Sequence, residues 1–201
     1  MTRDMTRRSL MTAVALALAT RPVVARAARR SFDSLLGSRR MVRRFTAEPV
    51  TDADVARLLS TAARAPSAGN TQPWAFVVVR QESMREALAR AAHGQLWLAS
   101  APVAIVACAD LSRSRPRYHD RAERYGHIDV AFASLLLMLA GTEAGLGACF
   151  VGAFDDGEVT RLLGLPVHVR PVAIIPVGHP AESPPPSTLR PMATIRHDER
   201  W

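Results

Sequence analysis

The sequence of 201 residues predicts an α+β domain. Three unbroken apolar runs, 75–79, 102–109 and 172–177, are typical of buried β-strands. Before and between them, apolar residues recur at helical spacing, and several of these segments end at proline or glycine. Apolar residues make up 48% of the chain, so a protein of this length can bury one sizeable core.

The positive charge of the chain is concentrated at its beginning. The net charge of +8 comes entirely from arginine, because the sequence has no lysine. Residues 1–27 hold five arginines and one acid, so half of the charge lies there. The remainder mixes both signs, and we therefore expect no nucleic-acid partner. The planar guanidinium group instead suits recognition of a phosphate.

Residues 1–27 have the pattern of a secretory signal peptide. Arg7 and Arg8 precede a short apolar run, 11–19, and Ala25-Arg26-Ala27 has the small residues of a cleavage site. This run is too short to span a bilayer stably, so we expect no stable membrane anchor. The paired arginines resemble a twin-arginine signal and predict an exported, periplasmic domain over 31–201. The alternative is a cytoplasmic protein with an N-terminal extension.

Two cysteines, Cys108 and Cys149, lie in apolar runs and are expected to be buried structural thiols. The sequence has no CxxC pair and no Cys/His spacing that is typical of metal ligands. We therefore expect no metal site.

The first half of the domain alternates helices and strands. The expected elements are a helix over 31–38, an extended segment over 39–45, a helix from 51 to 66, a strand over 75–79 and a helix over 83–92. The third element begins with a capping-box spacing, Thr51 followed by Asp54, and it stops at Pro66.

The second half contains the longest helix. The expected elements are a strand over 102–109, an arginine-dense lid or arm over 111–125, a helix over 126–144, a glycine-rich segment over 145–154, a helix over 156–163, a strand over 172–177 and an extended arm from 184. The long helix is apolar almost all round, so we expect it to be enclosed in the core or between subunits. Gly145 provides its C-terminal stop.

Two polar stretches carry the functional prediction. Arg39 to Phe45, RRMVRRF, places four cations in six residues, and like charges repel one another unless an anion lies among them. Ala65 to Trp74, APSAGNTQPW, is a polar loop between a helix and a strand, where ligand-binding residues are common. The two stretches resemble the R-R-x-x-R-x-F and P-S-x-x-N-x-Q-P-W segments of the FMN-dependent nitroreductase family. The resemblance covers about residues 31–200.

The resemblance implies a fold, a cofactor and an activity. The fold is a three-layer α/β/α arrangement with a mixed, mostly antiparallel central sheet flanked by helices, in an intertwined homodimer. The enzyme would use FMN to transfer hydride from NAD(P)H to a small-molecule electron acceptor such as a nitroaromatic, a quinone or an activated alkene. An exported enzyme would lack cytoplasmic NAD(P)H, so the predicted export and this donor conflict.

The resemblance also implies roles for individual residues. Arg39 would face the phosphate and ribityl side of FMN. Arg43 would face the pyrimidine edge, where a cation stabilises the charge of the reduced ring, and it is the expected catalytic residue. The expected cofactor-binding residues are Arg39, Arg40, Arg43, Ser67, Asn70, Gly147, Gly152 and Arg190. Met41 and Thr188 stand where the family often has a serine and a second basic residue.

The chemistry of these side chains agrees with such roles. The amide of Asn70 can donate to a ring carbonyl and accept from a ring N–H. Gly147 and Gly152 belong to a G-L-G-x-x-x-x-G segment, whose backbone can approach a flat ligand closely. Arg190 lies where the family places a basic residue on the FMN phosphate. Gln72 is expected to tie the polar loop together rather than to touch a ligand.

Other functions stay open on the sequence alone. The chain could hold flavin as a carrier or sequestering protein without turnover, or it could catalyse reductive dehalogenation or flavin fragmentation on the same fold. An arginine-rich nucleic-acid binder would instead show steep salt dependence and no chromophore.

Overall fold

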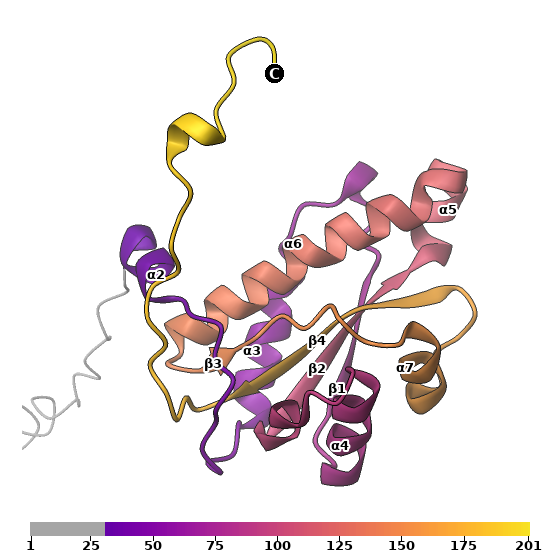
Figure 1. Ribbon diagram of the computed structural model, residues 1–201. Coiled ribbons are helices and arrows are strands. Elements are labelled where there is room, and N and C mark those ends of the chain that lie inside the picture. Colours follow the sequence, from indigo (N-terminus) through magenta and orange to yellow (C-terminus); the bar gives the residue numbers. More distant parts are fainter. Residues whose placement is uncertain (1–30) are drawn as a thin grey trace, which may run out of the picture. The chain divides into compact units, whose positions relative to one another are not determined.

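A four-stranded sheet forms the centre of residues 31–201, the part of the chain that the computed structural model describes (Figure 1). The strands are β1 (Trp74–Val79), β2 (Val103–Asp110), β3 (Gly147–Ala148) and β4 (Val169–Gly178). Their order is β1-β2-β4-β3, and every neighbouring pair is antiparallel. The predicted signal peptide, 1–27, lies outside the described residues.

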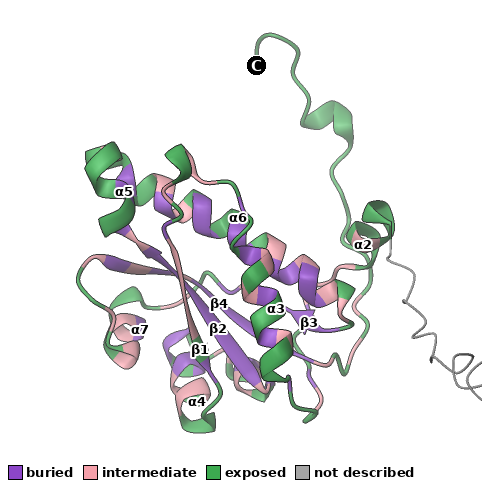
Figure 2. Cartoon of the chain, turned by 180° about the vertical axis from the view of Figure 1, so that it is seen from behind, coloured by how far each residue is buried: buried purple, intermediate pink, exposed green. Residues whose placement is uncertain are grey.

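Helices cover both faces of this sheet. The helices of the described residues are α2 (Phe32–Ser38), α3 (Asp52–Ala62), α4 (Glu82–Ala91), α5 (Leu111–Tyr118), α6 (Ala122–Glu143) and α7 (Asp156–Leu163). Short 3₁₀ turns are η1 (Ala68–Asn70), η2 (Leu96–Ser100), η3 (His119–Arg121) and η4 (Met192–Thr194). Figure 2 shows that the inner strands are buried while the outward faces of the helices are exposed.

Strand β2 separates two hydrophobic cores. Val103, Ile105 and Ala107 join the core that contains α3 and α6. The alternate residues, Ala104 and Val106, join the core that contains α4 and α7. Because successive side chains of a strand point to opposite faces, the fully apolar run of β2 fills both cores. The expected three-layer α/β/α fold of the α+β class is therefore confirmed.

The start of α3 follows its sequence signal. The hydroxyl of Thr51 accepts from the Asp54 N–H at 3.1 Å, and the Asp54 carboxylate accepts from the Thr51 N–H at 3.2 Å. This reciprocal pair satisfies two N–H groups that a helix N-terminus leaves unpaired. The side chain bond to Thr51 is also the main reason why the pKa of Asp54 lies below its ordinary value.

The longest helix, α6, begins earlier than predicted and has one exposed side in the protomer. It begins at Ala122 rather than 126, so Gly126 lies inside the helix. The glycine allows a close approach to α5, because an added Cβ at this position would lie 3.1 Å from Leu111. One side of α6 is exposed in the protomer, at Ile128 (40%) and Phe132 (46%), so the core alone does not enclose it, and enclosure between subunits stays a prediction. The helical region Leu111–Glu143 is long and apolar enough to cross a membrane, but half of its apolar window is buried in this fold, as in the core helix of a globular domain.

The arginine-dense arm is also more regular than expected. Residues 111–118 form α5, whose start is capped by the Asp110 carboxylate accepting from the Ser112 N–H at 3.0 Å. The two cysteines are buried as predicted, and burial raises the pKa of Cys108 to about 12. Within residues 31–201, no cluster of three or more His, Cys, Asp or Glu side chains could hold a metal ion.

Candidate active site

The arginine-rich segment 39–45 is held between the end of the sheet and the chain that leaves β4. The Val42 N–H donates to the Ala148 carbonyl at 3.1 Å, beside a parallel bridge between Met41 and Ala148. On the other side, the Ala181 N–H donates to the Arg44 carbonyl at 2.9 Å. Because backbone hydrogen bonds hold the segment on both sides, the backbone positions from which its side chains extend are fixed.

The carboxylate of Glu182 accepts three hydrogen bonds from this segment. Its Oε1 accepts from the backbone N–H groups of Arg43 at 2.6 Å and Arg44 at 3.1 Å, and its Oε2 accepts from Arg44 Nε at 3.1 Å. These bonds, led by that of the Arg43 N–H, hold the pKa of Glu182 below its ordinary value. The carboxylate therefore stays ionised and offsets part of the repulsion among the arginines.

The arginines themselves have three different environments. Arg40 is engaged, since it donates to the carbonyl oxygens of Gly37, Arg39 and Pro184 at 2.7–3.1 Å. The exposed guanidinium of Arg43 lies 5.7 Å from the ring centre of Trp97 in a cation–π contact. In contrast, Nη1 of Arg39 is buried and has no hydrogen-bond partner. Arg39 therefore has an unused donor, whereas the donors of Arg40 already bind the protein.

The second predicted stretch, 65–74, folds as a tight loop around η1. Asn70 and Gln72 both have left-handed backbones, which residues other than glycine rarely adopt, with φ of 55° and 47°. Ser67 Oγ accepts from the Gln72 N–H at 3.0 Å, and Asn70 Oδ1 accepts from Gln72 Nε2 at 3.0 Å. Gln72 thus ties the loop together, as expected. Such strained backbones persist only where the surroundings hold them, and they are frequent at ligand sites.

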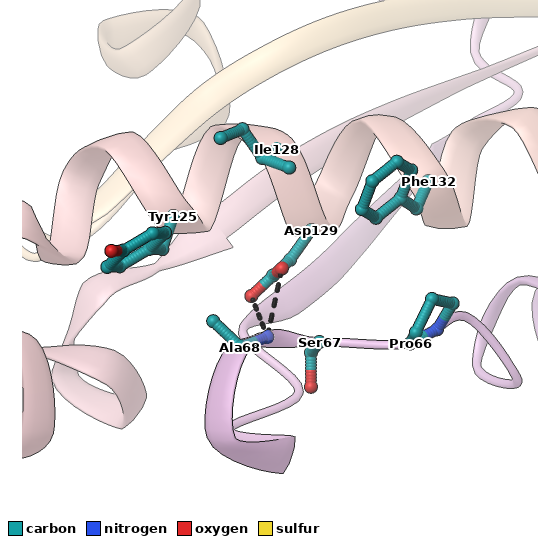
Figure 3. Close-up of a pocket in the computed structure, with 7 residues that line it drawn as sticks. All are labelled: Pro66, Ser67, Ala68, Tyr125, Ile128, Asp129 and Phe132. Carbon is teal, nitrogen blue, oxygen red and sulfur yellow. Dashed lines mark hydrogen bonds between the residues drawn. The ribbon is translucent and has the colours of Figure 1, made fainter. Parts of the chain in front are cut away.

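The surroundings that hold this loop include a buried acid on α6. Both carboxylate oxygens of Asp129 lie 3.1 Å from the Ala68 nitrogen, and the residue is only 2% exposed (Figure 3). Burial raises the pKa of Asp129, and the bond from the Ala68 N–H opposes this rise. Beside it is an open, mostly apolar pocket of about 260 Å³, lined by Pro66, Ser67, Ala68, Tyr125, Ile128, Asp129 and Phe132.

Three functional candidates were not predicted from the sequence: Glu182, Trp97 and Asp129. For Asp129 a signal existed, because a single acid within an otherwise apolar stretch of helix needs a partner when it is buried. Glu182 and Trp97 had no local signal, since each acts on a residue far away in the chain.

The two predicted glycines are not equivalent. At Gly147 a Cβ would lie 2.8 Å from the side chain of Val42, so the glycine lets the arginine-rich segment pack on β3. This packing gives a structural reason for the glycine in the described protomer, and its backbone contact with flavin stays a prediction. At Gly152 a Cβ would meet only Phe150, at an ordinary 3.4 Å, and the position is exposed. Arg190 is exposed on the C-terminal arm and donates to the Thr194 carbonyl at 2.8 Å.

The sequence model of the Nitroreductase family matches residues 36–179. The chain belongs to the nitroreductase family. The predicted class of enzyme, an FMN-dependent oxidoreductase of the nitroreductase type, is thereby confirmed.

Relatives with assigned names span most of the chain. It is 32% identical to an NADH dehydrogenase of Thermus thermophilus, over 78% of this chain and 90% of that protein. It is 33% identical to a putative NADH dehydrogenase/NAD(P)H nitroreductase of Methanothermobacter thermautotrophicus, over 82% and 84%. Among solved structures, the NADPH:FMN oxidoreductase of Vibrio harveyi complexed with NAD+ matches with a TM-score of 0.77 and 26% identity, over 83% of this chain and 76% of that one.

In this nitroreductase, the two predicted stretches are bound at separate points along α6 within the described protomer. The polar loop is bound to Asp129 near the start of α6, whereas the arginine-rich segment is bound to Ala148, just after α6 ends. From Asp129 to Glu143 the helix rises by about 21 Å, at 1.5 Å per residue. Figures 1 and 2 show, from opposite sides, that α2 lies near one end of α6 and α5 at the other.

Proposed function

We propose that this nitroreductase binds FMN and transfers hydride from NAD(P)H to nitroaromatic, quinone or activated-alkene acceptors, as a homodimer. One observation carries the proposal. Among residues 31–201, the only buried side-chain nitrogen or oxygen atoms without a hydrogen-bond partner are Arg39 Nη1 and Thr71 Oγ1. They lie in the two stretches that the family resemblance assigns to the flavin. An unpaired buried donor is costly, so its presence at both places supports a polar ligand there.

The residues present fit the chemistry of FMN. A guanidinium with an unused donor suits the phosphate, and this supports Arg39 as the phosphate ligand, with Arg190 as a second candidate. Bound FMN would supply the two-electron carrier between donor and acceptor. The overall reaction on a nitro group is R–NO₂ + NAD(P)H + H⁺ → R–NO + NAD(P)⁺ + H₂O, which balances in atoms, charge and electrons.

The protein would stabilise the charge that reduction creates. Arg43 is the only one of the arginines in segment 39–45 with a cation–π contact, so its guanidinium has a defined place beside Trp97. A cation already in position lowers the cost of negative charge on the cofactor, because no solvent has to reorganise. Glu182 fixes the backbone of Arg43 and so contributes to its position.

The separation of the two stretches supports the proposed homodimer. Two copies related by a two-fold axis, with their α6 helices antiparallel, would bring the arginine-rich segment of one copy near the polar loop of the other. The exposed apolar face of α6, at Ile128, Phe132 and Leu135, supports such a contact. Size-exclusion chromatography with light scattering tests it: a flavin-loaded monomer would contradict the dimer.

We also propose export by a twin-arginine signal within 1–27. The support is the residue pattern alone, and the test is replacement of Arg7 and Arg8 by lysine. This double variant should accumulate as precursor; undiminished export would exclude the twin-arginine route. Because NAD(P)H is cytoplasmic, an exported enzyme needs another donor, which a screen of reduced donors can identify.

The decisive experiment is purification of the chain, a visible spectrum and a turnover assay. A flavin spectrum, FMN release on denaturation and donor-dependent reduction of a nitroaromatic are the expected results. Flavin retention without reduction of any acceptor would favour the alternative of a flavin-holding protein. A folded but colourless protein that takes up no added FMN would refute the proposal.

A further inference from the structure

Two arginines and two tyrosines form a contiguous cluster between α5 and α6. The rings of Tyr118 and Tyr125 meet edge to face, with centroids 4.7 Å apart and an interplanar angle of 62°. The guanidinium of Arg117 lies 5.8 Å from the Tyr118 ring centre, and that of Arg121 lies 5.1 Å from the Tyr125 ring centre. We name these four residues the Arg–Tyr cluster. Its tyrosines are half-buried and its arginines are exposed.

The Arg–Tyr cluster lies directly on the polar loop of the candidate site. Arg117 Nη1 donates to the Gly69 carbonyl at 3.4 Å. A Cβ on Gly69 would lie 2.6 Å from the Tyr118 hydroxyl and 2.7 Å from Arg117 Nε, so a larger residue there would have to displace these two side chains. Tyr125 also lines the pocket that contains Ser67 (Figure 3). The cluster is therefore continuous with the loop that holds the predicted flavin ligands.

The chemistry of this surface is both aromatic and cationic. The half-buried rings of Tyr118 and Tyr125 offer flat, weakly polar contact area. Five arginines but only two acids lie between residues 113 and 124, which leaves a local excess of positive charge. A guanidinium group binds a carboxylate through two parallel N–H groups, and it also stacks on aromatic rings.

We propose that the Arg–Tyr cluster selects aromatic electron acceptors that carry an anionic substituent, such as a carboxylate. The aromatic ring would lie against the tyrosines, and Arg121 would bind the anionic group at the edge of the pocket. This inference rests on the proposed function and names its substrate class. An anionic group could also come from the phosphates of a dinucleotide donor, and the experiment separates these two sources.

A purely structural role of the cluster makes a different prediction. Arg117 hydrogen-bonds the loop, so its removal would disturb every reaction of the site alike. Arg121 contacts Tyr125 and has no hydrogen bond or ion pair among those found in the structure, so it is the cleaner probe of charge recognition. Arg115 is a matched control, because it lies in the same helical region but lines a separate cavity with His119, Asp120 and Glu123.

The test compares two acceptors of the same shape, 4-nitrobenzoate and 4-nitrobenzamide, on the FMN-loaded protein. In Arg121→Gln the ratio of kcat/KM for the carboxylate to that for the amide should fall about two- to fivefold, the range expected for loss of one exposed ion pair. The ratio should stay unchanged in Arg115→Gln. In the native protein, added salt should lower the activity toward 4-nitrobenzoate more than that toward the amide.

Several outcomes would overturn the inference. An equal loss of both activities in Arg121→Gln would show a structural role. In Arg121→Gln, the KM for NADH could rise while the KM for the phosphate-free donor 1-benzyl-1,4-dihydronicotinamide and the ratio of kcat/KM for the two acceptors stay unchanged. This result would assign the cluster to binding of the donor. Dissociation constants of benzoate and benzamide, measured by flavin absorbance, repeat the test without turnover, and Arg121→Gln should weaken only benzoate. Absence of bound FMN, or of turnover with 4-nitrobenzamide, would instead contradict the proposed function.

Discussion

The carboxylate of Glu182 accepts a 2.6 Å hydrogen bond from the backbone N–H of Arg43. The two residues are 139 positions apart in the chain, and this contact joins the chain after the last strand of the sheet to the segment that carries the expected catalytic arginine. A charged acceptor with three donors defines the backbone of Arg43 more firmly than neutral bonds would. The position of Arg43 therefore depends on the ionisation of Glu182.

Replacing Glu182 should impair the site in an acid-sensitive way. The folded-state pKa of Glu182 is lowered, so its contribution is fully present above the ordinary value of 4.5 and is lost as the pH falls through the lower folded pKa. We expect Glu182→Ala to weaken FMN binding several-fold at neutral pH, and Glu182→Gln to weaken it less, since an amide oxygen still accepts. Flavin titration from neutral to acid pH measures both effects. Identical affinities in all three proteins would exclude the positioning role.

Removing Arg39 should weaken FMN binding strongly. Hydrogen bonds to a charged group contribute about 1.5–3 kcal/mol, so Arg39→Ala should lose roughly 10- to 100-fold in affinity. Arg57→Ala is the control, because Arg57 pairs with Glu143 on the outer face of α3. If Arg190 binds the phosphate, Arg190→Ala should also lose affinity, whereas Arg196→Ala on the same arm should not. Equal flavin occupancy in the Arg39 variant and the native protein would remove the phosphate role.

Arg43 should matter for the rate of reduction more than for binding. In Arg43→Ala, stopped-flow measurements should show flavin reduction slowed by about 100-fold, in line with the loss of one preorganised charge-stabilising group. Trp97→Leu should give a smaller loss, and Trp97→Phe should retain most of the rate because a ring still faces the guanidinium. Unchanged reduction kinetics in Arg43→Ala would assign the catalytic charge to another residue.

The buried acid Asp129 should make stability depend on pH. Its folded pKa is raised above the ordinary value of 3.8, so the native state binds the proton more tightly, and this carboxyl should lower stability as the pH rises through that interval. In Asp129→Asn this contribution to the slope should vanish, while the amide oxygen can still accept from the Ala68 N–H. Urea unfolding at a series of pH values measures the slope. The same slope in both proteins would mean that burial does not shift this group.

Gly147 and Val42 should be energetically coupled. A Cβ at Gly147 would lie 2.8 Å from Val42, and such overpacking costs about 1–3 kcal/mol, so Gly147→Ala should lower the free energy of unfolding by that amount. Val42→Ala in the same protein should recover part of the loss, because it removes the clashing atoms. Gly152→Ala, where the added atom meets an ordinary contact, is the matched control. Strict additivity in the Gly147/Val42 double-mutant cycle would contradict the packing interpretation.

Local signals in the sequence predicted much of the fold. The capping box at Thr51 and Asp54, the doubly buried run of β2 and the glycine stop after α6 all depend on residues a few positions apart. The start of α6 was misplaced because Gly126 serves a tertiary contact rather than a helix end. The arginine-dense arm shows no helical pattern in the sequence because only two of its residues, Leu111 and Ala122, are buried and apolar among many charges.

The candidate site was predictable only in part, because some of its contacts join residues that are far apart in the chain. Residue types in the two polar stretches indicated a flavin site, but the partners that position them lie elsewhere in the chain. Glu182 is joined to Arg43, Trp97 to the same arginine, and Asp129 to Ala68, and no local pattern encodes these pairs. That the two stretches lie near opposite ends of α6 is a property of the three-dimensional path alone.

This placement has a consequence for how the enzyme would be handled in solution. If the arginine-rich segment and the polar loop of one flavin site come from different polypeptides, FMN can bind fully only after two chains have associated. The fraction of chains with bound FMN then depends on protein concentration by mass action. In dilute samples the protein would lose bound flavin and its activity per chain would fall. Adding more protein, and not only more flavin, would restore both the bound flavin and the activity.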